Sequence, residues 1–439
     1  MRERVGVISD DSSATVMTII DIWREGKTVV MIGMDAPVLA ISNIAIENSV
    51  CKIYCSWELL QNYEGCFPGI PIIAFAHKKC DKLITKGLSD YLYPESDEAA
   101  LILYSSGTTG KSKGIILSHK AIVGNARAVI KYMAPKAEDK IAVVKSLVHS
   151  STIVGEVMVA ICSGCDLIFV KNHNNIGRTI DMIYKSKATI VCINPTILSL
   201  IIKLNRSILI TKGVYLKKMY VSGAILDNNL LQTARDMLPN VHIYNVYGMT
   251  ECGPRISSQE LSNTYMNNSV GKAIENVFLR IRDENGNEIS KCHARGLIEV
   301  NTPYQAIGYV RGSSINLTDD GWVKTNDVGF WDEEGNLYIT GRYDNMINCA
   351  GHNVFPESIE ELIKSINGVK DCLIVGKKDI VFGNTLRCYY SGRRNKESEI
   401  IALCRSVLLP HEIPHSVVRV NELQYSNGKV KRMQFEDYV

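Results

Sequence analysis

The sequence predicts an α/β fold, with a large N-terminal domain of parallel βαβ sheets plus a β-rich subdomain, and a small α/β C-terminal domain. Three observations predict it. Short apolar strands alternate with helices as far as about residue 250, which is typical of parallel βαβ units. After about Ser258, short strands follow one another with Asn, Gly and Asp turns between them. Beyond Asp344, helices and strands alternate again.

Length and composition narrow the class of protein. A chain of 439 residues is too long for one core and implies two or three folding units. Its 46% apolar and 22% charged residues are ordinary for a globular protein, and its net charge of +3 without a long basic block argues against nucleic-acid binding. No signal peptide and no membrane-length apolar run are visible, and the thirteen cysteines are scattered. We therefore expect a cytoplasmic protein without a membrane span.

The first elements alternate at short spacing. Val5–Ser9 reads as a strand, and residues 10–13 then offer caps for an amphipathic helix over Ala14–Glu25, which Gly26 ends. Lys27–Ile32 forms the next strand, Pro37 stands at the first turn of the next helix, and Cys51–Cys55 is a third strand. His77–Glu98 is polar and reads as a connector.

The middle of the chain continues the pattern. Three of its strands end at small or polar turns, namely His149–Thr152, Ser222–Ala224 and Tyr247–Gly253. Ligands bind at the carboxyl ends of strands in open α/β sheets, so these turns are expected to converge on one crevice. The predicted elements are the helix Ala121–Met133, the strand Ile141–Val148, an apolar helix, the strands Asp166–Val170 and Thr189–Ile193, the helix Pro195–Leu204, and the strands Lys217–Val221 and Val241–Val246.

The last part of the chain divides in two. We place the β-rich subdomain at about residues 259–341 and a domain boundary near Asp344, so that the domains are 1–343 and 344–439. The predicted elements are the strands Val277–Asp283, Gly296–Asn301, Trp322–Thr325, Leu337–Thr340 and Cys372–Val375, and the helices Pro356–Ser365 and Glu397–Leu408.

The stretch from Leu101 to Leu117 carries the strongest functional signal. Two apolar strands, Leu101–Tyr104 and Ile115–Leu117, flank the loop Ser105–Gly114, which holds five hydroxyls, three glycines and two lysines. Glycines let backbone N–H groups approach an anion, and hydroxyls and ammonium groups add donors, so the loop predicts polyphosphate binding. It is not a Walker A loop, because Ser105 stands where that motif requires its first glycine. The alternative is a simple surface turn.

One cysteine pair has the spacing of a metal or redox motif. Cys162 and Cys165 are separated by two residues, but they lie within the apolar run Val154–Val170. A pair of small buried side chains is therefore preferred to a redox site.

Four motifs in one order resemble the adenylate-forming superfamily, which includes acyl- and aryl-CoA synthetases, peptide-synthetase adenylation domains and beetle luciferases. The motifs are Ser105–Gly114, Tyr247–Glu251, Trp322–Asp327 with Gly341–Asp344, and Asn427–Arg432. The resemblance runs from about Val5 to Arg432, with a shortened N-terminus. It implies ATP and Mg²⁺ as cofactors, and CoA or a carrier-protein phosphopantetheine as the acyl acceptor.

The resemblance also implies roles for particular residues around ATP. The Ser105–Gly114 loop would hold the β- and γ-phosphates, and Asp327 would accept from the ribose hydroxyls with Arg342 beside it. Tyr247 would stack on adenine and Asn245 would bind its amino edge. The implied nucleotide-contacting residues are Ser105, Ser106, Gly107, Thr108, Thr109, Gly110, Lys111, Lys113, Ser222, Gly223, Ala224, Asn245, Tyr247, Gly248, Asp327 and Arg342.

The implied catalytic residues lie in both domains. Thr250 would contact the α-phosphate, Glu251 would bind Mg²⁺, and Lys429 would enter the site from a mobile C-terminal domain that hinges at Asp344. Hard oxygen ligands suit Mg²⁺, and a lysine point charge can bridge a carboxylate and a phosphate. Plain structural roles remain as alternatives for these residues: a helix-start acid for Glu251, a solvated basic tail for Lys429 and a loop acid for Asp344.

His149 indicates which class of acid the resembling enzymes would activate at this position. Resembling enzymes that activate simple acids carry His here, whereas amino-acid-activating domains usually carry an Asp that pairs with the substrate ammonium. An imidazole cannot replace that carboxylate, so we expect a small carboxylic acid without an α-amino group; a structural histidine is the alternative. The residues expected to make its pocket apolar are Ile153, Ile193, Met249 and Cys252.

Some positions depart from the family's pattern. Asn326 replaces a usual Gly, Asn348 a frequent Lys, Asn353 a frequent Arg or Lys, and Gln424 a usual Pro. Several of these lie in the segment that faces the thiol, so the acceptor is less defined than the adenylation.

The sequence thus predicts an AMP-forming acid–thiol ligase. Two alternatives remain. One is a stand-alone adenylation enzyme that loads an amino or aryl acid onto an acyl or peptidyl carrier protein. The other is a non-catalytic protein that binds a nucleotide or an acyl-adenylate.

Overall fold

The computed structural model describes residues 2–63, 65–105, 113–170, 175–204, 215–224, 226, 228–261, 269–312, 314–349, 352–379, 383–426 and 429–430. Side chains are described for these residues except 105, 204, 229, 383, 425, 426, 429 and 430. The chain divides into two compact units, Met1–Leu279 with Glu299–Lys324, and Arg280–Ile298 with Thr325–Val439. The predicted boundary near Asp344 rests on the change from successive strands to alternating helices and strands, and it stays a prediction.

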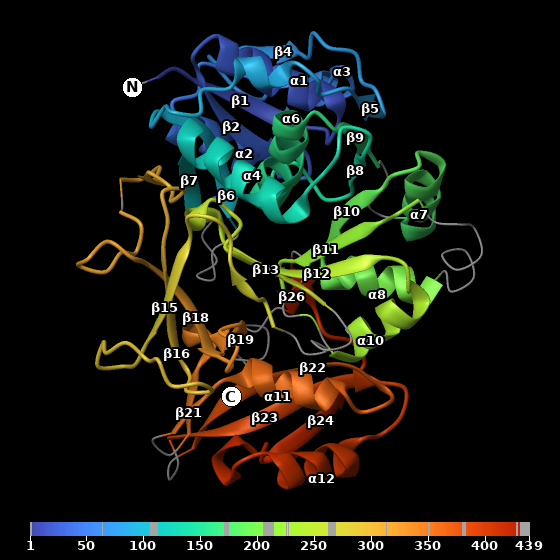
Figure 1. Ribbon diagram of the computed structural model, residues 1–439, viewed down its shortest axis with the longest axis vertical. Coiled ribbons are helices and arrows are strands. Elements are labelled where there is room, and N and C mark those ends of the chain that lie inside the picture. Colours follow the sequence, from blue (N-terminus) through green and yellow to red (C-terminus); the bar gives the residue numbers. More distant parts are fainter. Residues whose placement is uncertain are drawn as a thin grey trace. The chain divides into compact units, whose positions relative to one another are not determined.

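The first sheet of the first unit has the strand order β17-β7-β6-β2-β1-β3-β4. Its five strands from β6 to β4 are parallel, and β7 and β17 are added antiparallel at one edge. Figure 1 shows α1 and α4 beside this sheet. The strands are β1 Arg4–Ser9, β2 Thr28–Gly33, β3 Lys52–Cys55, β4 Ile72–Ala74, β6 Ala99–Ser105, β7 Lys113–Ser118 and β17 Gly308–Tyr309, and the helices are α1 Ser13–Arg24, α2 Val38–Glu47, α3 Trp57–Tyr63, η1 Leu88–Tyr91 and α4 His119–Met133.

The second sheet has the order β14-β13-β12-β11-β10-β8-β9-β5, in which the strands from β12 to β9 are parallel. Leu198 of α8 and Leu231 of α10 pack on it in one apolar cluster. The strands are β5 Lys82–Leu83, β8 Lys140–Val143, β9 Asp166–Phe169, β10 Ile190–Ile193, β11 Lys218–Ser222, β12 His242–Tyr247, β13 Ser257–Glu260 and β14 Lys272–Ala273, and the helices are α7 Ile176–Lys185, α8 Pro195–Leu204, α10 Asn228–Met237 and η3 Thr250–Cys252.

A helix with a π-helical middle lies against both sheets. It consists of α5 Ser150–Thr152, the π-helix η2 Ile153–Met158 and α6 Val159–Ser163. Its apolar side chains join those of α1, α4 and both sheets in the main core of the unit, where Val154, Val157 and Ile161 are buried. Single π-helical turns are rare and frequently occur at functional sites.

The remaining, smaller sheets belong mostly to the second unit, since residues 278–279, 299–301 and 323–324 of their strands are counted with the first. One has the order β15-β16-β18-β19, and another has the order β22-β23-β24 with Ile359 of α11 and Ile400 of α12 in its core. The elements are β15 Phe278–Arg282, β16 Gly296–Asn301, β18 Val323–Trp331, β19 Leu337–Arg342, η4 Tyr343–Asn345, β20 Ile347–Cys349, β21 His352–Val354, α11 Pro356–Lys364, β22 Val369–Asp379, β23 Gly383–Gly392, α12 Glu397–Val407, η5 Pro410–Glu412, β24 Ser416–Val420, β25 Tyr425–Ser426 and β26 Lys429–Val430.

The predicted α/β class is confirmed, and the main corrections concern the bounds of individual elements and the direction of some strands. The expected strand Ile141–Val148 was too long, because β8 ends at Val143 and Asp11 then accepts from Leu147 N in a turn. The expected connector His77–Glu98 contains β5 and the short helix η1. The sheets are also mixed rather than purely parallel, since β7 and β13 pair antiparallel with their neighbours.

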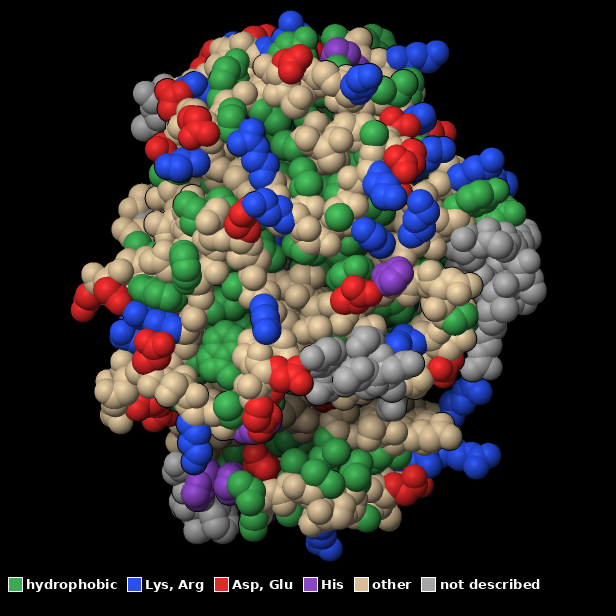
Figure 2. Space-filling model, viewed as in Figure 1, with side chains coloured by type: hydrophobic (Ala, Val, Ile, Leu, Met, Phe, Trp, Pro, Cys, Tyr) green, Lys and Arg blue, Asp and Glu red, His purple; other side chains and the backbone are tan. Residues whose placement is uncertain are grey.

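No helix among the described residues is long and apolar enough to cross a membrane. Figure 2 shows positive and negative side chains interspersed on the face in view.

Candidate active site

The carboxyl ends of β11 and β12 lie side by side. Their parallel register pairs Ser222 with Val246, so the Ser222–Ala224 turn starts next to Tyr247. Gly223 has a φ of 97°, a conformation that favours glycine, and both Gly223 and Ala224 are exposed. Two of the predicted turns therefore meet at one sheet edge.

Gly248 allows the next turn to close. A Cβ at this position would lie 1.9 Å from the carbonyl oxygen of Pro254, so only glycine fits this backbone. Tyr247 is half-buried, whereas Asn245 is buried and donates from Nδ2 to the carbonyl oxygen of Ser269 at 3.0 Å. The implied contacts of these two side chains with adenine stay predictions.

Glu251 belongs to a cluster with Lys113 and Tyr309. The Tyr309 hydroxyl donates to Glu251 Oε1 at 3.1 Å, and Lys113 Nζ lies 5.5 Å from the centre of the Tyr309 ring. Burial, with the Glu251 carboxylate as a second cause, raises the pKa of Tyr309 well above its ordinary value, so this phenol remains a donor. The structure thus brings a lysine of the phosphate loop close to the expected metal ligand.

Sequence reasoning missed Tyr309. It lies in the two-residue strand β17, 58 positions from Glu251, and β17 pairs with β7 so that Tyr309 lies opposite Ile115. In the sequence, Tyr309 stands out only as part of the dipeptide Gly308–Tyr309. Its distance along the chain from the motif Tyr247–Glu251 follows no known pattern that would have connected the two.

Thr250 lies beside the turn that follows β8. Its Oγ1 is 2.7 Å from Ser150 Oγ, and Ser150 directly follows His149. The His149 side chain keeps contact with solvent, yet the protein packed around its ring, and secondly the Lys145 cation, lower the pKa of His149. A neutral imidazole at this place offers one donor and one acceptor, but no charge that would pair with an ammonium group.

In the second unit, the structure brings three of the predicted residues together. Arg342 Nη1 lies 3.2 Å from Asp327 Oδ1, and Arg342 Nη2 lies 3.1 Å from Asp344 Oδ2. Asn326 Nδ2 donates to Asp344 Oδ1 at 3.4 Å, and the φ of Asn326 is 61°. Asparagine is among the few residues that tolerate this conformation, which accounts for Asn326 where the related enzymes usually have glycine.

Several predicted site residues lie outside the residues or side chains that the structure describes. Lys429 belongs to β26, but its side chain is not described, and the same holds for Ser105 at the end of β6. The residues wholly outside are Ser106, Gly107, Thr108, Thr109, Gly110 and Lys111. Their roles stay predictions.

The residues at this place can supply one ligand to a magnesium ion. Glu251 is half-buried, and Tyr309 donates to one of its two carboxylate oxygens. Within the described ranges, no group of three His, Cys, Asp or Glu side chains could hold a metal. A single carboxylate suits Mg²⁺, which commonly takes its other ligands from water and substrate phosphates.

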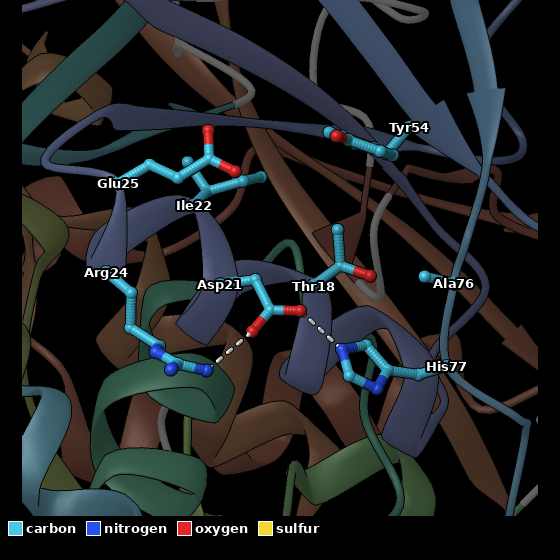
Figure 3. Close-up of a pocket in the computed structure, with 8 residues that line it drawn as sticks. All are labelled: Thr18, Asp21, Ile22, Arg24, Glu25, Tyr54, Ala76 and His77. Atoms are coloured by element: carbon cyan, nitrogen blue, oxygen red, sulfur yellow. Dashed lines mark hydrogen bonds and ion pairs between the residues drawn. The ribbon is translucent and has the colours of Figure 1, made fainter.

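A cavity of about 480 Å³ lies elsewhere in the first unit, next to α1. Figure 3 shows Asp21 directed toward both His77 and Arg24, and Asp21 Oδ2 lies 2.5 Å from His77 Nε2. The distance from Asp21 Oδ1 to Arg24 Nη1 is longer, at 3.5 Å. Because no residue of the four motifs lines this cavity, we do not place the candidate site there.

Comparisons with known proteins identify the family. The family model described as AMP-binding enzyme matches residues 2–310. The chain is 25% identical over 359 residues to a long-chain-fatty-acid–CoA ligase of Yersinia pestis, covering 79% of this chain and 63% of the relative. It is 29% identical over 342 residues to a 2-succinylbenzoate–CoA ligase of Bacillus cereus, covering 76% and 68%. It thus spans less than two thirds of the Yersinia relative.

Solved structures have the same fold. ATP-bound MatB from Rhodopseudomonas palustris has a TM-score of 0.87 at 21% identity, covering 100% of this chain and 90% of that one. The o-succinylbenzoate CoA synthetase of Bacillus subtilis, in complex with the acyl-adenylate intermediate OSB-AMP, has a TM-score of 0.82 at 19% identity, covering 99% and 88%.

Proposed function

The chain belongs to the AMP-binding enzyme family, and from this membership we propose that it is an AMP-forming acid–thiol ligase. It activates a small carboxylic acid with ATP and Mg²⁺, and then transfers the acyl group to a thiol. The single observation that carries the proposal is the Lys113–Tyr309–Glu251 cluster, which joins the phosphate loop to the expected metal ligand.

The first half-reaction forms the acyl-adenylate. A carboxylate oxygen of the acid attacks the α-phosphorus of ATP, and the bond to the bridging oxygen breaks to release pyrophosphate. Bound Mg²⁺ would supply charge neutralisation for the phosphates, held by Glu251. Thr250 and Lys113 donate to phosphate oxygens, and Lys429 neutralises the meeting anions. Positioning and electrostatic stabilisation of this kind dominate the catalysis of phosphoryl-type transfer.

The second half-reaction breaks the acyl–oxygen bond. The sulfur of the acceptor thiol, having lost its proton, attacks the acyl carbon, and AMP leaves with the oxygen that came from the carboxylate. The names of the relatives favour CoA as the acceptor. A carrier-protein phosphopantetheine offers the same thiol chemistry and is the second candidate acceptor. An enzyme that uses this acceptor would be the stand-alone adenylation enzyme.

Two further features support the reaction class and its compartment. Glu251 and Lys429 would be unnecessary in a protein that only binds a nucleotide. All thirteen cysteines are free, and burial raises the pKa of Cys162 to about 11, which argues against a redox pair with Cys165. Free thiols fit the reducing cytoplasm, where we place the protein.

A panel of acids tests the proposal. Pyrophosphate release is measured with ATP, Mg²⁺ and each acid, and thioester formation is measured with CoA and with a phosphopantetheinylated carrier protein. We expect acid-dependent pyrophosphate release by acids that lack an α-amino group, and thioester formation with CoA. Activation of amino acids alone would overturn the inference from His149. A protein that releases no pyrophosphate with any acid would be the nucleotide-binding protein instead.

A further inference from the structure

A cluster of buried charges lies behind Ser150 and Thr250. It consists of Lys145, Glu156 and Arg255, whose exposed fractions are 8%, 0% and 2%. Lys145 Nζ lies 3.1 Å from Glu156 Oε1. Charged side chains are rarely buried this completely, so the cluster calls for an explanation.

Local backbone features create the space for these side chains. Lys145 lies two residues beyond the end of β8, and Glu156 belongs to the π-helix Ile153–Met158. Gly155 leaves room for the guanidinium, because a Cβ there would lie 2.5 Å from Arg255 Nε. Any side chain at position 155 would displace Arg255.

The charges of the cluster do not balance. Lys145 and Arg255 are two cations, and Glu156 is the one acid among the three. Burial raises the pKa of Glu156, whereas Lys145 and then Arg255 act in the opposite direction. Even with Glu156 fully ionised, one positive charge remains in a place where solvation by water is minimal. A buried charge without a counter-charge is costly, which favours an anion from outside the chain.

Unused hydrogen-bonding capacity lies at the same place. Among the described residues, Arg255 Nε, the Tyr132 hydroxyl, the Thr152 hydroxyl and both carboxylate oxygens of Glu156 are buried without a hydrogen-bond partner. The Arg255 cation acts on the pKa of Tyr132, which places the two side chains near each other. Buried unpartnered donors commonly mark a site that water or a ligand fills.

The cluster connects directly to the residues expected to meet the acid. Arg255 Nη2 donates to the carbonyl oxygen of Ser151 at 3.2 Å, and Lys145 Nζ donates to Ser151 Oγ at 3.3 Å. The neighbouring Ser150 contacts Thr250, and the Lys145 cation lowers the pKa of His149. Both cations therefore bond Ser151, which follows Ser150 in the chain, and Ser150 contacts Thr250, the residue expected at the α-phosphate.

We propose that the acid carries a second carboxylate, which Arg255 and Lys145 recognise. This inference rests on the proposed function and names its substrate class, a dicarboxylic acid. One carboxylate reacts with ATP at Thr250, and the other remains unreacted and accepts hydrogen bonds from the buried cations. The competing explanation is an internal ion-pair cluster that only stabilises the fold.

Matched pairs of acids test the substrate class. Pyrophosphate release is measured for monocarboxylic acids and for dicarboxylic acids of the same carbon skeleton. Hydrogen bonds to charged groups contribute about 1.5–3 kcal/mol, so kcat/KM is expected to favour the dicarboxylic partner by roughly 10- to 100-fold. A wild-type protein that prefers the monocarboxylic partners overturns the inference while leaving the proposed function intact.

Variants assign the preference to the cluster. Arg255→Met should lower kcat/KM for dicarboxylic acids far more than for monocarboxylic acids, and Arg255→Lys should retain part of the preference because it keeps the charge. Arg311→Met is the matched control, since Arg311 is 75% exposed and pairs with Glu47. Equal losses on both kinds of acid in Arg255→Met would mean that Arg255 acts through the fold alone, and the inference would be wrong.

A binding measurement separates this inference from the proposed function. Dicarboxylic acid without ATP should raise the melting temperature of the wild type but not that of Arg255→Met. If this shift occurs and no acid releases pyrophosphate, the anion site stands and the proposed function falls. If neither occurs, both fall.

Discussion

At the scale of single residues, Tyr309 is the side chain that the structure adds to the site. Its hydroxyl donates to Glu251 Oε1, and its ring lies under the Lys113 cation. A hydrogen bond fixes the orientation of a carboxylate that must hold a metal ion, much as outer partners orient metal ligands in general. Tyr309 is therefore a positioning residue rather than a catalytic one.

Removing this hydroxyl tests that role. Tyr309→Phe should raise the Mg²⁺ concentration for half-maximal pyrophosphate release by about 10-fold, because a hydrogen bond to a charged group is worth about 1.5 kcal/mol or more. Tyr54→Phe is the matched control, because the Tyr54 hydroxyl lies away from the site and accepts a hydrogen bond of 3.0 Å from Lys52 Nζ. An unchanged Mg²⁺ dependence in Tyr309→Phe would show that Glu251 does not rely on Tyr309.

The same scale shows where sequence reasoning stops. The resemblance named Asp327, Arg342 and Asp344, and the structure brings these three motif residues together. Lys145 and Arg255 are 110 positions apart, and neither belongs to a motif. Their meeting depends on a π-helix and on Gly155, which no periodicity of the sequence reveals.

At the scale of elements, α4 begins with a buried histidine. Ser118 caps the helix by accepting from Ala121 N, and His119 packs edge-on between the rings of Trp23 and Tyr93. Both ring nitrogens of His119 are buried without a hydrogen-bond partner among the described residues. Burial lowers the pKa of His119 from 6.5 to about 4, so the ring is neutral in the folded protein.

This histidine makes stability depend on pH. Between pH 6.5 and 4 the unfolded chain takes up a proton at position 119 that the folded chain refuses, so the free energy of unfolding falls as the pH falls through this window. The loss attributable to His119 approaches about 3 kcal/mol near pH 4. His119→Phe should unfold at a denaturant concentration that changes less over the window than in the wild type. Parallel pH profiles for the two proteins would contradict this account.

The accuracy of the predicted elements follows from their amphipathicity. The helix Pro195–Leu204 is found with the predicted bounds, since Pro marks its first turn and its apolar positions follow a helical period. The two-residue strands β5 and β17 were not predicted, because two residues carry no periodicity. The strand β23 was also missed, although it pairs antiparallel with the preceding strand β22, with Asp379 opposite Gly383.

At the scale of the whole molecule, the proposed reaction requires two half-reactions from one chain. The resemblance implies that Lys429 serves adenylation and that the C-terminal domain turns about Asp344 before the thiol reacts. Domain motion of this kind can complete a catalytic site for one step and release it for the next.

Lys429→Ala separates the two steps. The variant should lose acid-dependent pyrophosphate exchange but still bind ATP, and it should still transfer the acyl group from a supplied acyl-adenylate to CoA. Lys431→Ala is the control for the general positive charge of this segment and should exchange pyrophosphate as the wild type does. Normal exchange in Lys429→Ala would leave this residue as part of a solvated basic tail.

The central claim is that the chain forms an acyl-adenylate, and oxygen transfer tests it most directly. The acid is supplied with both carboxylate oxygens as ¹⁸O, together with ATP, Mg²⁺ and CoA, and the AMP product is examined by mass spectrometry. Our account predicts one ¹⁸O atom in each AMP, because the carboxylate oxygen that attacks the α-phosphorus leaves with it. Unlabelled AMP, or label found in inorganic phosphate, would contradict it.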